Sequence, residues 1–173
     1  MLGDFVKGKD LSHLPNHWQQ GIRLHRAIDV YTDHHPIVKQ LRTELGPLRR
    51  YGGIIIDILF DHILAKQFSQ HNHGEDLASF APKVYADFLQ QPEPLPDNFL
   101  LISQRMAEYD WLTSYQHVDI LKRVLERTST RLSRQPPLHD AHPWYLQQQI
   151  HLDELFTIFY ADLIDMAHGA KIE

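Results

Sequence analysis

Three polar residues near the start of the chain, His25, Asp29 and Asp33, stand four positions apart. On a helix this spacing places all three side chains on one face. One imidazole and two carboxylates suit a divalent cation that prefers nitrogen and oxygen ligands. The same pattern also occurs on an ordinary solvated helix face, where His25 and Asp29 would form an i, i+4 pair. The spacing alone leaves both interpretations open.

A second group, Asp57, Asp61 and His62, interrupts the most apolar stretch of the sequence. A charge within so hydrophobic a helix is unfavourable unless it is paired or bound to a metal ion. The aspartates can also cap a helix or pair with an arginine, but we favour a functional site, because two carboxylates and an imidazole exceed what pairing needs. The two groups are expected to face each other and pool ligands, as in all-α metal-dependent phosphohydrolases.

The composition narrows the classes of protein and of site. The chain has 173 residues, 13 histidines and no cysteine, and its net charge is −5. Without cysteine, any metal site must use His, Asp and Glu. A net acidic chain is a poor candidate for nucleic-acid binding. No segment approaches the ~20 apolar residues that cross a bilayer, and the charged start does not resemble a signal peptide. We expect a cytoplasmic protein with no membrane span and no nucleic-acid partner.

The elements that must position these residues are expected to be helices. Glycine and proline are far apart, and apolar residues recur at three- and four-residue spacing. Asn16 is a suitable N-cap, and Pro36 is expected to end the first helix and open the next. The sequence predicts an all-α, compact single-domain bundle of six or seven helices. The expected ranges are 16–35, 37–50, 52–69, 75–91, 97–110, 117–134 and 140–168.

Basic residues gather in the predicted helix 117–134. They include Lys122, Arg123, Arg127 and Arg131, and their spacing puts several of them on one face. Such a run is usually a solvated charged surface. The functional interpretation is that this face binds an acidic partner, since local positive potential steers such a partner even toward a net acidic protein.

Three segments together resemble a known family. They are Leu2–Gly8 (LGDFVKG), Gly21–Asp33 (GIRLHRAIDVYTD) and Asp57–His62 (DILFDH). They are similar to acyl carrier protein phosphodiesterase, also called acyl carrier protein hydrolase, and the likeness covers nearly the whole chain. The family is bacterial, cytoplasmic and all-α, and is regarded as a divergent relative of the HD phosphohydrolases. The resemblance therefore implies an HD-domain-like bundle.

The resemblance also implies a reaction. The family hydrolyses the phosphodiester that joins 4′-phosphopantetheine to a serine of holo-acyl carrier protein, giving apo-carrier protein and 4′-phosphopantetheine. Mn²⁺ is the favoured metal, with Mg²⁺ or another divalent cation as alternatives. The acidic carrier protein fits the basic face of helix 117–134.

Under this resemblance, a divalent ion would lower the pKa of a bound water and polarise the phosphoryl group. Arg26 would stabilise negative charge on the phosphodiester oxygens. Asp33 or Asp57 would orient the water or a ligand imidazole. The expected metal ligands are His25, Asp61 and His62, with Asp4 or Asp29.

Members of the family carry about one further helix before the Gly-Asp-Phe-Val motif, whereas Met1 stands almost directly before it here. We expect residues 1–173 to form a single helical phosphodiesterase domain without that helix, with exposed core surface that favours a homo-oligomer. Two other functions stay open. One is an HD-like phosphohydrolase of a small-molecule or nucleotide substrate, and the other is a non-catalytic helical protein that binds the carrier protein.

Overall fold

The structure, a computed structural model, describes residues 5, 6, 8–90 and 96–170. Within these residues the all-α prediction is confirmed, because every regular element is helical. Seven of the α-helices described here are nine residues or longer, as expected from the sequence. The α-helices are α2 (Asn16–His34), α3 (Pro36–Glu44), α4 (Gly52–Lys66), α5 (Phe68–His71), α6 (Leu77–Leu89), α7 (Asp97–Glu108), α8 (Trp111–Ser114), α9 (Val118–Arg131) and α10 (Ala141–Gly169), and two 3₁₀ helices span Gly46–Tyr51 and Leu138–Asp140.

Local chemistry sets where the first helices end. Pro36 opens α3 as expected, and the ring of His35 before it accepts a hydrogen bond from the Ile37 amide. The predicted extent 37–50 is wrong at its end, because α3 stops at Glu44 and a 3₁₀ helix follows. Gly46 has a φ of +53°, which suits glycine, and the next residue, proline, supplies no N–H to continue an α-helix.

The expected cap of the first long helix is also wrong. Pro15 occupies the cap position of α2, and Asn16 is the first helical residue, with no side-chain hydrogen bond that caps the helix. A proline immediately before the helix fixes the direction of chain entry through its restricted φ, so α2 begins without the side-chain acceptor that was expected.

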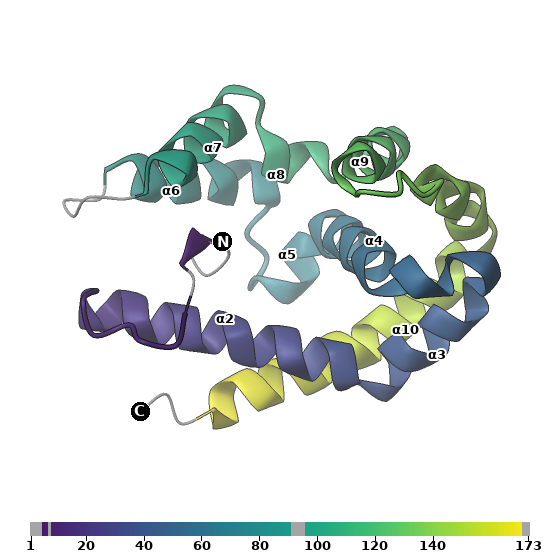
Figure 1. Cartoon of the computed structure of the whole chain (residues 1–173), viewed down its shortest axis with the longest axis horizontal. Helices are drawn as coiled ribbons and strands as arrows, with labels where there is room; N and C mark the ends of the chain where they lie inside the picture. The colour runs from purple at the N-terminus through teal and green to yellow at the C-terminus, as the bar shows by residue number, and fades with distance from the viewer. Residues whose placement is uncertain (1–4, 7, 91–95, 171–173) are drawn as a thin grey trace.

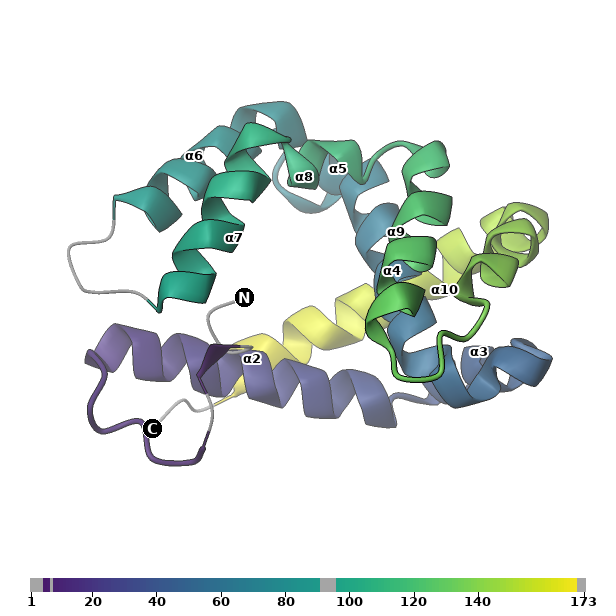
Figure 2. The same cartoon turned by 45° about the horizontal axis from the view of Figure 1, so that its top comes forward.

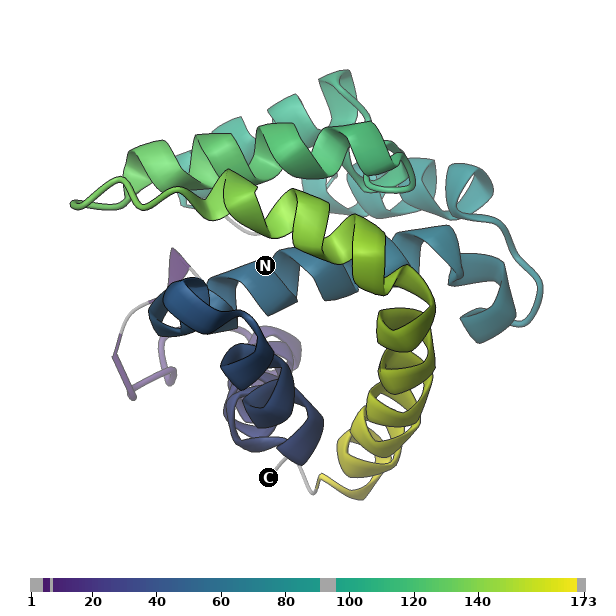
Figure 3. The same ribbon diagram turned by 90° about the vertical axis from the view of Figure 1, so that its right-hand side faces the viewer.

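The main core surrounds α4. Nine of its residues are buried, and it packs against α3, α9 and α10. Figure 3 shows α9 lying along one side of α4, while α10 passes from there to the side of α3. Burial of apolar surface is the largest favourable contribution to the free energy of folding, and here it holds α4 in a fixed orientation. Any polar group that α4 presents is therefore held on a rigid support.

A second, smaller core lies between α6 and α7. It is formed by Ala81, Tyr85 and Met106. Figures 1 and 2 show these two helices as a hairpin at one end of the molecule, joined to α9 through α8, while α2 and α10 cross on the other side. Among the described residues, no helix is both long enough and apolar enough to cross a membrane.

Candidate active site

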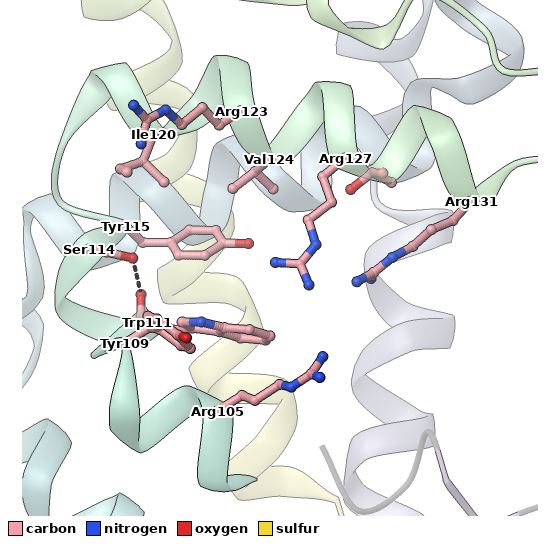
Figure 4. A pocket seen from close by; sticks show the side chains of 11 residues that line it. Arg105, Tyr109, Trp111, Ser114, Tyr115, Ile120, Arg123, Val124, Arg127 and Arg131 are labelled. Carbon is pink, nitrogen blue, oxygen red and sulfur yellow. Dashed lines mark hydrogen bonds between the residues drawn. The ribbon is translucent and has the colours of Figure 1, made fainter. Parts of the chain in front are cut away.

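A pocket of about 600 Å³ lies where α7, α8 and α9 meet. Its walls combine cationic, aromatic and aliphatic side chains, a composition that suits an anionic organic ligand. Figure 4 shows these side chains around the hollow. The lining residues are Arg105, Tyr109, Trp111, Ser114, Tyr115, Ile120, Arg123, Val124, Arg127, Thr128 and Arg131.

Three guanidinium groups converge in this pocket. Arg105 reaches in from α7, and Arg127 and Arg131 reach in from α9, so that all three end beside the Trp111 ring (Figure 4). The guanidinium carbon of Arg127 lies 5.5 Å from the centre of that ring, in a cation–π contact. Planar guanidinium groups present paired donors that match the oxygens of phosphate and carboxylate. The pocket is therefore built for an oxyanion.

The sequence of α9 explains why its arginines point this way. Arg123, Arg127 and Arg131 recur every four residues, whereas Leu121 and Leu125 on the other face are buried in the main core. This separation is the usual pattern of a surface helix. In Figure 4 the side chain of Arg123 extends beside Ile120, away from the other guanidinium groups, so Arg123 lines the edge of the pocket.

The aromatic wall depends on the turn between α7 and α8. Asp110 has a φ of +43°, a left-handed conformation that aspartate tolerates better than most residues. The Tyr85 hydroxyl from α6 donates to Asp110 Oδ1 at 3.0 Å and accepts from the Leu112 amide at 2.8 Å. These two bonds flank Trp111 in the chain. The smaller core thus positions the ring against which Arg127 rests.

Two carboxylates of α4 act on the same pocket. Burial raises the pKa of Tyr115 to about 12, and the negative charges of Asp61 and Asp57 add to the rise, while the charges of Arg131 and Arg127 oppose it. In Figure 4 the Tyr115 hydroxyl is directed toward Arg127. Asp57 and Asp61 themselves do not line the pocket, so their charges act on it only through Tyr115.

Asp61 has a strongly perturbed carboxyl group. Its side chain is accessible to solvent, but surrounding protein displaces much of the water around it. This desolvation raises the pKa of Asp61 to about 7, and the nearby charge of Asp57 adds to the effect. Carboxyl groups this perturbed are frequent in functional sites, although Asp61 itself does not line the pocket.

His62, the next residue, points elsewhere. Its side chain is buried, and Nδ1 is hydrogen-bonded to the backbone carbonyl oxygen of Tyr115. Desolvation lowers the pKa of His62, so the ring is neutral at pH 7 and Nδ1–H donates to the carbonyl. The His62 ring also meets the Tyr145 ring edge-on at 5.3 Å. Asp61 and His62 thus have different surroundings: Asp61 is exposed to solvent, and His62 is buried in the core.

Comparison with known proteins assigns the chain to a family. The family model described as acyl carrier protein phosphodiesterase matches residues 1–163. The chain belongs to the acyl carrier protein phosphodiesterase family. Similar proteins with that name come from Salmonella agona (strain SL483), Salmonella dublin and Salmonella newport (strain SL254), and each is 30% identical over 99% of this chain and 88% of the relative. No solved structure matches the chain, so the HD-domain-like architecture stays a prediction.

The α2 residues that the sequence predicted as metal ligands or catalytic groups contact other residues of the chain. His25 Nδ1 lies 3.7 Å from Asp29 Oδ1, as the i, i+4 interpretation predicts. Asp33 Oδ1 lies 4.0 Å from a guanidinium nitrogen of Arg42 on α3. Arg26 donates to the carbonyl oxygen of Val6 at 2.9 Å. None of these four α2 residues lines the pocket, and their predicted roles in metal binding and catalysis stay predictions.

The described residues do not by themselves assemble a metal centre. Among them, no three His, Asp or Glu side chains are grouped so that they could hold an ion. The predicted ligand Asp4 lies outside the described residues. Two carboxylates, Asp57 and Asp61, supply oxygen donors on one helix, but the described part of the chain offers them no third ligand. We therefore derive no chemical step through a metal ion.

Sequence reasoning found part of the pocket. Of the expected docking residues, Arg123, Arg127 and Arg131 line it, whereas Lys122 is exposed on α9 outside it. Sequence reasoning did not find Arg105, Trp111 and Tyr115. The available signal was weak: two aromatic residues stand four apart between the single arginine of α7 and the basic helix α9. Only the fold shows that α7 and α9 meet there.

Proposed function

We propose that this chain hydrolyses the phosphodiester between 4′-phosphopantetheine and a serine of holo-acyl carrier protein. The observation that carries the proposal is the convergence of Arg105, Arg127 and Arg131 in one pocket, in a chain that belongs to this family. Guanidinium groups stabilise the charge that develops on phosphoryl oxygens during transfer.

The reaction requires groups that stabilise the phosphoryl oxygens and groups that orient the attacking water. Water attacks phosphorus, the bond from phosphorus to the serine oxygen breaks, and the serine oxygen leaves with a proton. Arg127 and Arg131 hold the phosphoryl oxygens, and Trp111 fixes the Arg127 guanidinium in place. Asp57 and Asp61 are the acidic groups proposed to orient the water, since their charges act on Tyr115 in the wall of the pocket.

Mn²⁺ remains part of the proposal on the strength of the resemblance alone. A bound divalent ion would supply Lewis-acid activation of water and phosphoryl oxygen. Activity that disappears in EDTA and returns with Mn²⁺ is the expected result. A cytoplasmic location belongs to the same proposal, because holo-acyl carrier protein must be accessible to the enzyme.

The acidic carrier protein is proposed to dock on the exposed basic edge of α9. Arg123 lines the edge of the pocket, away from the converging arginines, and Lys122 is the exposed residue before it on α9. A positive rim of this kind steers an acidic partner and raises the association rate. The prosthetic group of a docked carrier protein can then enter the pocket while its acidic surface stays on the rim.

The proposal is tested by incubating the purified chain with holo-acyl carrier protein and Mn²⁺ and measuring the mass of the carrier protein. The wild-type chain is expected to remove the prosthetic group, and Asp61→Ala to leave it in place. Cleavage of small phosphodiesters without loss of the prosthetic group would favour the alternative HD-like phosphohydrolase. Carrier-protein binding with no cleavage under any divalent cation would favour a non-catalytic binding protein.

A further inference from the structure

The converging arginines have no acidic partners of their own. Within the described part of the chain, Arg105, Arg127 and Arg131 have no carboxylate oxygen within 4 Å, although other cations such as Lys66 and Lys83 form ion pairs. Three like charges directed at one space repel each other unless an anion lies between them. The structure maintains this arrangement through the Trp111 contact and the fixed faces of α7 and α9.

The walls of the pocket divide into two ends. The three guanidinium groups lie at one end, and Ile120, Val124 and the ring of Tyr115 lie toward the other (Figure 4). An anion with an organic substituent fits this division, with its charged group among the arginines. The residues that line the pocket include four arginines and no carboxylate, so its walls carry an excess of positive charge.

The substrate and product of phosphodiester hydrolysis differ in charge. A phosphodiester carries one negative charge, whereas a phosphate monoester carries about −1.5 to −2 at pH 7 and has three terminal oxygens that accept hydrogen bonds. Three guanidinium groups can serve all three oxygens of a monoester, but only two non-bridging oxygens of a diester. The group that remains after the reaction is therefore the better match to the arginines.

We propose that Arg105, Arg127 and Arg131 form a subsite that prefers a dianionic phosphate monoester over a monoanionic phosphodiester, so that the phosphorylated product competes with the substrate. The competition rests on the proposed function. The binding preference is a property of the pocket and is measurable without turnover.

The test is isothermal titration calorimetry of the full chain at pH 8 in EDTA, so that no divalent metal contributes to anion binding. Methyl phosphate and dimethyl phosphate are the two probes, since they differ by one methyl group and one charge. Methyl phosphate is expected to bind at least about tenfold more tightly, because the additional charge and oxygen gain charge-assisted hydrogen bonds. Equal affinities, or no measurable binding of methyl phosphate, would overturn the proposal.

Matched variants locate the binding. Arg127→Gln and Arg131→Gln are each expected to weaken methyl phosphate binding by at least about tenfold. Arg134→Gln removes the same charge at an exposed position beyond the end of α9, outside the pocket, and is expected to leave affinity unchanged. Equal losses in all three variants would mean that the anion senses only net charge, and the subsite would be rejected.

The consequence for turnover is tested separately. If holo-acyl carrier protein is cleaved, added 4′-phosphopantetheine is expected to inhibit competitively in the wild type and at least about tenfold less strongly in Arg127→Gln. A chain that binds methyl phosphate selectively but cleaves no carrier protein would retain the subsite and refute the proposed function. Cleavage of the carrier protein without selective binding of methyl phosphate would support the proposed function and refute the subsite.

Discussion

The imidazole of His62 holds the backbone carbonyl of Tyr115, whose side chain lies in the cationic pocket. The bond spans 53 positions of sequence and ties α4 to the turn between α8 and α9. Because His62 is buried and fully enclosed by the core, this contact is rigid. It gives His62 a defined role in positioning Tyr115, whether or not the ring also serves as a metal ligand.

Replacement of His62 by alanine is expected to destabilise the metal-free protein by about 2–4 kcal/mol, because it leaves a cavity and an unpaired carbonyl oxygen. Urea unfolding in EDTA measures the change, and His168→Ala, at an exposed position near the end of α10, is the control. A His62 that acted only as a metal ligand would show no loss of stability without metal.

Asp61 is expected to make the stability of the metal-free protein depend on pH. Its pKa is raised from 3.8 to about 7 in the folded chain, so folding favours the protonated form. Stability should therefore fall as pH rises from about 4 to about 7, and the whole penalty should be present above pH 7. Solvent access screens the effect, which we place on the order of 1 kcal/mol.

Asp61→Asn removes this titration and is expected to unfold at higher urea concentration than the wild type at pH 8, with little difference at pH 4. Asp165→Asn, at an exposed position of α10, is the matched control. A wild-type chain in EDTA that gained stability relative to Asp61→Asn as the pH rose would contradict the expected sign.

Tyr85 is expected to act on the pocket from the smaller core. Tyr85→Phe removes both the bond to Asp110 and the acceptor of the Leu112 amide, at a cost of about 1–3 kcal/mol. Since these bonds hold the segment that carries Trp111, the variant should also bind methyl phosphate more weakly. Tyr109→Phe, which changes a largely exposed ring at 63% exposure, is the stability control. Unchanged methyl phosphate affinity in Tyr85→Phe would limit its role to stability.

Lys122 is expected to influence docking and not chemistry. Lys122→Glu should raise the KM for holo-acyl carrier protein by about threefold to tenfold at low ionic strength, with kcat unchanged and the effect reduced in high salt. The same reversal at Lys39, exposed on α3, is the control for net charge. An equal rise in KM from both variants would show that the basic edge of α9 is not the docking surface.

The helices could be predicted because their signals are local. Apolar spacing and the positions of proline and glycine placed α4, α9 and α10 within a few residues of their observed bounds. The error at the end of α3 arose because a helical pattern continues through Gly46, where the backbone has already changed to a positive φ.

The site was harder to predict because its residues meet only through tertiary structure. Asp61 and His62 are neighbours in sequence, yet successive helical residues point about 100° apart, and only the packing of α4 shows which one faces the core. Arg105 joins Arg127 because the left-handed Asp110 turns the chain between α7 and α8. No pattern within either helix encodes that meeting.

The most direct test of the account compares cleavage of holo-acyl carrier protein by three chains in Mn²⁺: the wild type, Arg127→Gln and Arg134→Gln, the last at an exposed position beyond the end of α9. Carrier-protein mass, followed over time, gives kcat/KM for each. The wild type and Arg134→Gln are expected to remove the prosthetic group, and kcat/KM is expected to fall by about 10²–10³-fold in Arg127→Gln. A fully active Arg127→Gln would contradict the assignment of the α7–α8–α9 pocket as the active site, and an inactive wild type would contradict the proposed reaction.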